Sequence, residues 1–170
     1  MQALLIIARI LHVLSGIMWV GVMVFNARFL GPALNDIGPD AGKVMQALVK
    51  RGFINFLPGV ATMTIISGAY LYWHDSVGLD STFTSSRPGM TFGLGAVLAV
   101  IAYIIGMVVI RPAIKVSLSL GPQLAGASEA DRAVMMAQMG AAREKSTMWG
   151  RIVAWLLILA AVAMAVARYT

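Results

Sequence analysis

Four apolar segments separated by polar connections dominate the pattern along this chain. They cover residues 3–30, 54–73, 90–110 and 150–168. A helix needs about 20 residues to cross the roughly 30 Å hydrocarbon core of a bilayer, so each segment is long enough to span it. The pattern predicts an all-α fold, a four-helix bundle in which residues 1–170 form a single transmembrane domain.

The connections on one side contain shorter helical patterns. Pro32 interrupts the chain after the first span, and an amphipathic helix then ends near Arg51. Gly121 breaks the chain after the third span. Ser128, with Asp131 three residues later, has the pattern of a helix N-cap. We expect amphipathic helices in both connections, the second either lying on the membrane surface or prolonging the last span.

Basic residues are distributed unevenly between the two sides. Of the 13 Lys and Arg residues, ten lie in the first and third connections or at the span ends that adjoin them, Arg9 lies within a span, and Arg87 and Arg168 lie on the opposite side. Basic residues concentrate in cytoplasmic loops. We therefore expect a bacterial inner-membrane protein with both termini and the loop at residues 74–88 on the periplasmic side.

Composition supports a lipid bilayer as the surroundings. Hydrophobic residues make up 59% and charged residues 12% of the chain, whereas a soluble domain has about 45–50% and about 25%. The net charge of +6 is explained by topology, so no nucleic-acid partner is expected. The chain has no cysteine, which excludes disulfides, thiolate metal sites and a CxxCH haem attachment. The N-terminus lacks the features of a signal peptide, so Met1 is expected to begin the first helix.

Two further patterns concern packing. The sequence LGPAL at residues 30–34 recurs 90 residues later as LGPQL at 120–124. Two αα repeats would explain this match, and a chance match, which is common in so apolar a chain, is an equal alternative. Gly95, Ala99, Ala102 and Gly106 recur at helical spacing, which predicts the close approach of a neighbouring helix.

The first span contains the most informative residues. His12 and Arg9 lie within its apolar run, and Gly16 and Trp19 continue the same helical face. An ionisable group at the centre of a bilayer costs roughly 2.5–3.5 kcal/mol on insertion scales, so it is usually functional. A neutral imidazole is a common haem and copper ligand. We interpret His12 as a metal or haem ligand, Gly16 as clearance for a flat cofactor, Trp19 as a pocket wall and Arg9 as a partner for a haem propionate. The alternatives are an interhelical hydrogen bond for His12 and a headgroup contact for Arg9.

A second ligand is suggested by His74, at the outer end of the second span, with Tyr70 one turn earlier on the same helix. Two histidines on neighbouring helices can bind one haem iron from opposite faces. His12 lies about nine residues inside its span, however, which is a depth difference on the order of 13 Å. A site with His12 alone is therefore an equal alternative, as is a solvated His74 beside Asp75.

One stretch resembles a known family. The pattern Leu11-His12-x3-Gly16-Ile17-x-Trp19-x-Gly21-x3-Phe25-Asn26-x5-Pro32, and the segment GAYLYW at residues 68–73, are similar to the membrane domain of bacterial membrane-anchored urate oxidases. A looser form of the first pattern is shared by copper-resistance D-type proteins and by haem-containing membrane protoporphyrinogen oxidases. The resemblance implies a small helical bundle that holds haem b through His12.

Together these patterns predict a b-type cytochrome-like protein that transfers electrons between a quinol or a redox partner protein and an outer acceptor. Whether it is an enzyme is left open, and no catalytic residue is assigned. One alternative is a copper-handling transporter that uses His12 and His74. Another is a non-catalytic subunit of a larger membrane complex, and a homo-oligomer is compatible with each function.

Overall fold

The computed structural model describes residues 2–170, and the expectation for Met1 lies outside these residues. Helix accounts for 92% of the chain, and no strand occurs among the described residues, which confirms the all-α class. The elements are α1 (Gln2–Phe25), η1 (Asn26–Leu30), α2 (Gly31–Ile37), η2 (Gly38–Asp40), α3 (Ala41–Lys50), α4 (Phe53–Asp75), α5 (Ser81–Thr84), α6 (Arg87–Ile105), η3 (Gly106–Ile110), α7 (Arg111–Leu120), η4 (Gly121–Ala125), α8 (Glu129–Val166) and η5 (Ala167–Tyr169).

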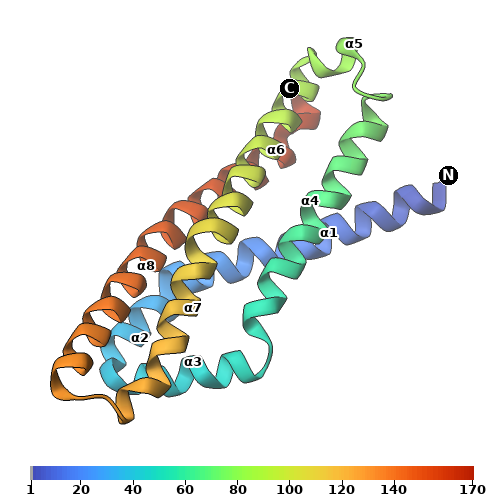
Figure 1. The fold of residues 1–170 in the computed structure, drawn as a ribbon. Coiled ribbons are helices and arrows are strands. Elements are labelled where there is room, and N and C mark those ends of the chain that lie inside the picture. The colour runs from blue at the N-terminus through green and yellow to red at the C-terminus, as the bar shows by residue number, and fades with distance from the viewer. Residues whose placement is uncertain (1) are drawn as a thin grey trace.

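Within the described residues, four helical segments are long and apolar enough to cross a membrane. They correspond to the four segments expected from the sequence and indicate an integral membrane protein. Three of them continue well past their apolar stretches. The first segment continues to Ile37, the third continues to Ala125, and the fourth already begins at Glu129. The bundle is therefore longer at one end than a bilayer requires (Figure 1).

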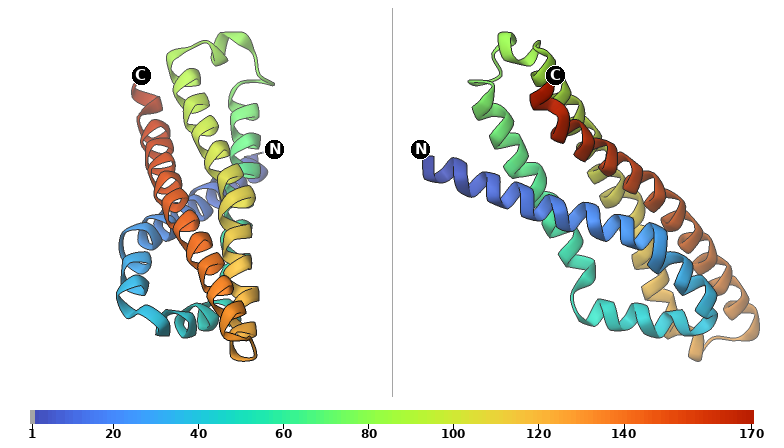
Figure 2. Two further views of the ribbon diagram at one scale, coloured as in Figure 1. Left: turned by 60° about the vertical axis from the view of Figure 1, so that its left-hand side comes forward. Right: turned by 180° about the vertical axis from the view of Figure 1, so that it is seen from behind.

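The long helices associate as two antiparallel pairs, α1 with α4 and α6 with α8, and the pairs meet through α1 and α8 and through α4 and α6. In the two views of Figure 2, α1 crosses the other helices at a steep angle, and its N-terminus stands away from α6 and α8. The C-terminus and α5 lie at one end of the molecule, and α2, α3 and the connection from α7 to α8 lie at the other (Figures 1 and 2).

Small residues form most of the buried core. Ala61, Ala99, Ala102 and Ala160 are buried around the larger Trp19, and Met23, Val153 and Leu157 complete the cluster. Most of the large apolar side chains point outward instead, as expected when lipid rather than water surrounds the bundle. Helices in a bilayer gain little from burying apolar surface, so close backbone contact through small residues is what holds them together.

The small-residue stripe on the third span is confirmed as a packing surface over most of its length. A Cβ atom on Gly95 would lie 3.1 Å from the Ala160 carbonyl oxygen of α8. Ala99 and Ala102 are also buried. Gly106 is the exception, because a Cβ atom there would contact nothing within 4 Å. The close contact between α6 and α8 therefore involves the first three positions of the stripe.

Two π-turns interrupt the long helices. The Gly31 amide donates to the Asn26 carbonyl, and the Arg111 amide donates to the Gly106 carbonyl, each across five residues. A proline follows in both cases, Pro32 and Pro112. Because proline has no amide hydrogen and its ring crowds the carbonyl four residues back, widening the preceding turn by one residue relieves the helix.

The π-turns also bear on the sequence repeat. They begin at residues 26 and 106, which is an offset of 106 − 26 = 80 residues. The LGP matches are 90 residues apart, and their backbones differ: Gly31 begins α2, whereas Gly121 begins a 3₁₀ turn after α7. The two π-turns and the two LGP sequences are therefore separated by different numbers of residues, and the backbone does not repeat with the sequence.

The helix that begins after Ser128 prolongs the last span, which decides between the two expectations for it. The Ser128 hydroxyl accepts from the Asp131 amide at 3.2 Å, and α8 then continues unbroken for 38 residues. On the opposite side, Asp80 caps the short α5. The Thr82 hydroxyl, together with the Thr82 and Phe83 amides, holds the pKa of the Asp80 carboxyl below its usual range.

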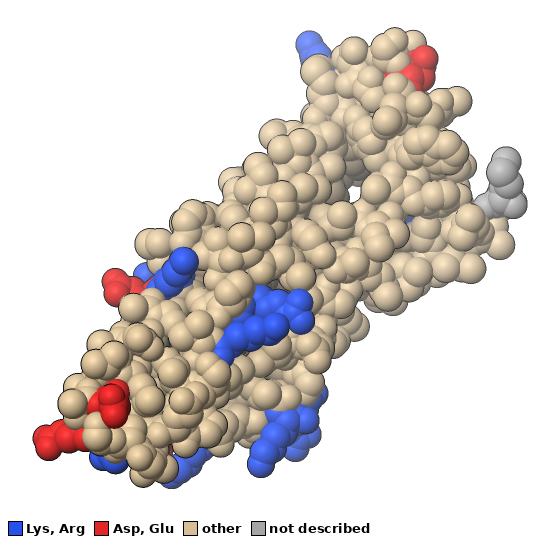
Figure 3. Space-filling view, in the orientation of Figure 1, with Lys and Arg blue, Asp and Glu red and all other residues tan. Residues whose placement is uncertain are grey.

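Charged side chains gather toward the ends of the molecule. On the face shown in Figure 3, basic atoms are most abundant in the lower half, and a broad band nearer the upper end is almost free of charge. The first and third connections, which together with the adjoining span ends contain ten of the basic residues, lie together at that lower end (Figure 1).

Candidate functional site: a histidine between two crossing helices

His12 lies on the face of α1 that turns toward the bundle. Ala8, Ser15, Trp19 and Met23 of this helix are buried, and they follow one another at intervals of seven or four residues, which keeps them on one side. His12 falls on the same stripe and is half-buried. The histidine therefore faces the neighbouring helix rather than lipid.

The imidazole of His12 makes a hydrogen bond to α4. Its Nδ1 lies 2.9 Å from the main-chain carbonyl oxygen of Thr64. A carbonyl oxygen can only accept, so Nδ1 carries the hydrogen and donates it. In the neutral ring the other nitrogen, Nε2, then has a lone pair and no hydrogen. This is the tautomer that a histidine needs in order to bind a metal through Nε2.

Gly68 is what allows the ring to lie against α4. A Cβ atom at this position would stand 2.7 Å from His12 Cε1 and 2.9 Å from Nδ1, which is closer than such atoms approach. Gly16, expected from the sequence to supply clearance, would place a Cβ atom at an ordinary 3.7 Å from a Thr64 methyl group. The glycine that is sterically required beside His12 is therefore Gly68 of α4, not Gly16 of α1.

Hydroxyl groups surround the same crossing. The Ser15 hydroxyl lies 2.6 Å from the Leu11 carbonyl, and the Thr64 hydroxyl lies 2.8 Å from the Ser15 oxygen. Ser67 is hydrogen-bonded to the Met63 carbonyl at 2.6 Å. Ser15, Thr64 and Ser67 are all buried, so their partners remove the cost of placing hydroxyls in an apolar region. The helix crossing is thus a polar seam inside the bundle.

His74 and Arg9 meet at a different level, through a residue that the sequence analysis did not assign to the site. Arg9 Nη2 lies 3.8 Å from Asp75 Oδ2, and His74 Nδ1 lies 3.4 Å from Asp75 Oδ1. The ring of Tyr70 is 6.3 Å from that of His74, centroid to centroid. These side chains form a partly exposed group at the C-terminal end of α4.

The two histidines therefore have different partners. His12 contacts Thr64 and Gly68, whereas His74 belongs to the group around Asp75. Gly68 and His74 are six residues apart, or about 9 Å along a helix. The two imidazoles therefore lie at different levels along α4.

Trp19 is buried but lies deeper than His12. Its ring stands edge-on to Tyr103 of α6, with centroids 6.5 Å apart, and it lines a cavity near the inner ends of α1 and α4. The tyrosine is tied to α4 by a 3.0 Å contact between its hydroxyl and that of Thr62. Trp19 therefore lines a cavity two helical turns away from the histidine, and its role as the wall of a cofactor pocket stays a prediction.

Sequence reasoning missed Gly68 and Thr64 as neighbours of His12. Both lie on one face of α4, four residues apart, and small residues at this spacing are typical of a close helix crossing. The spacing was visible in the sequence, but it does not show which residue of the neighbouring helix packs against these two positions.

The described residues contain no group of three or more His, Asp or Glu side chains able to hold a metal ion. A haem needs fewer protein ligands than a bare ion, because its porphyrin supplies four nitrogens. A single imidazole with an oriented Nδ1–H fits that requirement. Comparisons with protein-family models, curated proteins and solved structures give no match to this chain.

Proposed function

We propose that the protein is a small b-type haem protein of the membrane in which His12 Nε2 provides an axial ligand. The observation that carries this proposal is the hydrogen bond from Nδ1 to the Thr64 carbonyl. Histidines that bind metals almost always donate their other ring N–H to a carboxylate, a carbonyl or water, which fixes the ring and its tautomer. The resemblance of the first span to haem-binding membrane proteins supports the same ligand.

The remaining residues divide between two roles. Gly68 keeps α4 clear of the imidazole ring, and the Thr64 carbonyl holds the ring's orientation. Arg9, half-exposed near the outer end, is the residue we assign to a propionate, and His74 is the residue we assign as second ligand if the iron has two. A bound haem supplies a one-electron redox couple, so we propose electron transfer between a quinol or a partner protein and an outer acceptor.

We further propose a bacterial inner-membrane location with both termini on the periplasmic side. The support is the gathering of ten basic residues in and beside the two connections that lie at the same end of the bundle. His12 and the group around His74 then lie in the outer half of the membrane.

The test is a visible spectrum of protein purified in detergent from haem-supplied cells, before and after dithionite reduction. We expect a Soret band in the wild type and its loss in His12→Ala. The variant His12→Asn keeps an N–H donor near the Nδ1 position but cannot ligate iron, so it should lose haem while preserving more of the stability.

The matched control is His74→Ala, which removes the only other histidine. If His74 is the second ligand, this variant should retain haem but change from a low-spin to a high-spin spectrum. Full haem content in His12→Ala, or a colourless wild type, would contradict the proposal. A colourless protein that copper stabilises against heat would indicate copper handling instead.

A further inference from the structure

An apolar cavity of about 80 Å³ lies in the inner half of the bundle. It is lined by α1, α4, the stretch from α6 to α7, and α8, with Met45 of α3 at one end, and it is partly open to the surroundings. Trp19, Leu57, Ala61 and Val153 contribute to its apolar wall. The cavity is separate from the crossing that holds His12.

Among the described residues that line this cavity, the polar side-chain atoms belong to Trp19, Tyr103 and Arg111. The Tyr103 hydroxyl is already paired with Thr62. Arg111 differs, because its Nε is buried and has no hydrogen-bond partner. A buried N–H without an acceptor is unfavourable, and more so when it belongs to a charged group.

The position of Arg111 follows from the sequence of the third span. It comes directly after the π-turn, where the apolar run of α6 ends and α7 begins. Tyr103, Met107, Ile110 and Ile114 line the same cavity, and their spacing places them with Arg111 on one helical face. The guanidinium thus lies where the hydrocarbon region gives way to the basic end of the bundle, and the apolar cavity extends from it toward the membrane interior.

The partly exposed Arg111 also has no acidic partner in the cavity. The guanidinium is permanently positive, and no Asp or Glu occurs among the described residues lining the cavity. The ion pairs formed by the described residues involve Arg9, Lys43 and His74 rather than Arg111. Carboxylate and phosphate oxygens are the acceptors that match a guanidinium best.

We propose that this cavity binds an amphipathic anion, with a carboxylate or phosphate oxygen that accepts from Arg111 Nε and the nearest part of the hydrocarbon chain in the apolar cavity. The rest of the chain leaves the cavity and lies along the bundle. Such a head and tail occur in a free fatty acid, which bears a carboxylate, and in a membrane phospholipid, which bears a phosphate. The proposal does not depend on haem binding.

The experiment measures binding of three probes of equal chain length to the purified full-length protein in a non-ionic detergent. The probes are oleate, oleoyl lysophosphatidate and the uncharged monoolein, and native mass spectrometry reports occupancy. We expect both anions to bind and monoolein to bind at least about tenfold more weakly, since one charge-assisted hydrogen bond contributes at least that factor. The tighter of the two anions identifies the source of the head group.

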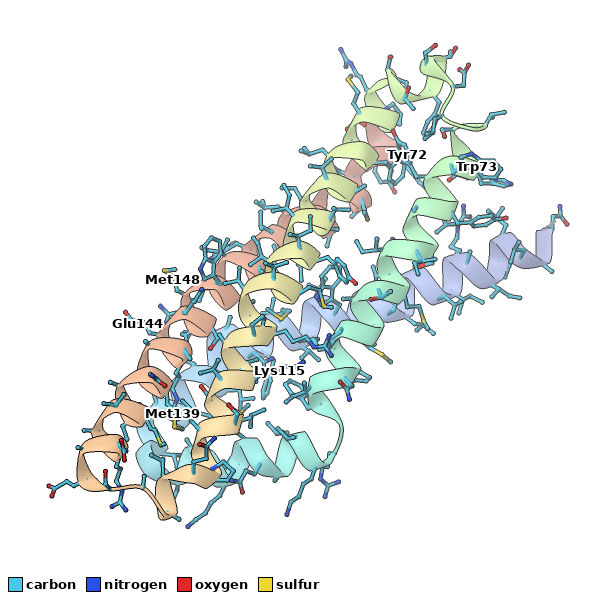
Figure 4. All side chains as sticks on the ribbon, viewed as in Figure 1. Tyr72, Trp73, Lys115, Met139, Glu144 and Met148 are labelled. Atoms are coloured by element: carbon cyan, nitrogen blue, oxygen red, sulfur yellow. The ribbon has the colours of Figure 1, made fainter. Side chains whose placement is uncertain are left out.

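Arg111→Gln should weaken binding of the anions about tenfold. The matched control is Lys115→Gln, which removes the same charge one turn later on α7. Lys115 is exposed and is not among the residues that line the cavity, and Figure 4 labels it on this helix. It should change binding less than twofold. Arg111→Lys keeps the charge and removes Nε–H, so it should also bind the anions more weakly. This variant tests the same hydrogen bond if Arg111→Gln does not fold.

Brominated oleate gives an independent readout, because bromine quenches a nearby indole. The measurement uses a variant in which Trp73, Trp149 and Trp155 are replaced by Phe, because Trp73 and Trp155 are exposed on the surface. We expect quenching in this variant that is largely removed when Trp19→Phe is added. Equal binding of monoolein, equal effects of Arg111→Gln and Lys115→Gln, or quenching that survives Trp19→Phe would overturn the proposal. Anion binding that persists in His12→Ala separates this site from the haem site.

Discussion

At the scale of single residues, the contact between His12 and Gly68 leaves no room for a side chain at position 68. The imidazole occupies space that any larger residue at position 68 would need, and the Thr64 carbonyl one turn earlier holds its Nδ1. Imidazole, carbonyl and glycine must therefore be present together. This explains how an ionisable side chain can be accommodated between two helices within the membrane.

Gly68→Ala should separate α1 from α4 and destabilise the bundle by about 1–3 kcal/mol, because the added methyl group overpacks the crossing. Equilibrium unfolding in mixed micelles would measure the change. If His12 ligates haem, the same variant should also shift or weaken the Soret band.

The control for this prediction is Gly59→Ala in the same helix. A Cβ atom at position 59 would meet nothing within 4 Å, and alanine is the better helix former by about 1 kcal/mol. Gly59→Ala should therefore be neutral or stabilising. A similar loss of stability in both variants would mean that the contact with His12 is not the cause.

At the scale of elements, the helices differ in how they begin and how far they continue. The two π-turns let α1 and α6 pass a proline and continue as α2 and α7. The helix α8 crosses the whole bundle without a break, and Met139, Glu144 and Met148 mark its course in Figure 4. Its inner half extends beyond the apolar stretch, so the cap at Ser128 has to hold a helix end that is exposed to water.

Ser128→Ala should loosen the first turn of α8, at a local cost of about 0.5–2 kcal/mol. The hydroxyl accepts from the Asp131 amide and also donates to the Asp131 carboxylate at 2.6 Å, and alanine removes both bonds. Hydrogen exchange at the first-turn amides should become faster while exchange within the apolar span is unchanged.

Ser146→Ala is the comparison, since this serine lies within α8 and donates to the Arg143 carbonyl of its own helix. Such a bond competes with the helix rather than capping it, so exchange should hardly change. Faster exchange along all of α8 in Ser128→Ala would show that the helix opens as one unit and that the cap is not a local feature.

At the scale of the whole molecule, the bundle consists of two antiparallel pairs, and three of the four long helices described continue past their apolar stretches at the same end. The extended side contains α2, α3, α7 and the beginning of α8, and it contains most of the basic residues (Figure 3). This asymmetry suits a protein with one face in the cytoplasm. The opposite side has only short connections and the group around Asp75.

The absence of cysteine permits a direct test of the proposed orientation. Single Ser81→Cys and Ser119→Cys variants place one thiol at each end, at positions that are both exposed. A membrane-impermeant maleimide added to spheroplasts should label Ser81→Cys at once and Ser119→Cys only after permeabilisation. The reverse order would place the termini in the cytoplasm and contradict the proposed topology.

Much of the architecture was predictable from the sequence, because hydrocarbon imposes a simple requirement. A segment that crosses it must satisfy its own backbone hydrogen bonds and must be apolar for about 20 residues. The four spans, their order and the packing stripe of Gly95, Ala99 and Ala102 follow from that requirement. The inward face of His12 was also predictable, from the helical spacing of its neighbours.

Only the tertiary structure decided which residues meet. Gly68, Thr64 and Asp75 lie more than 50 positions from His12, and helical periodicity contains no information about the register between two helices. That register assigned the clearance to Gly68 rather than Gly16, joined Arg9 to Asp75, and placed Trp19 in the inner cavity. The unpaired Nε of Arg111 is likewise a result of packing, because whether a donor is satisfied depends on every element around it and on no single stretch of the chain.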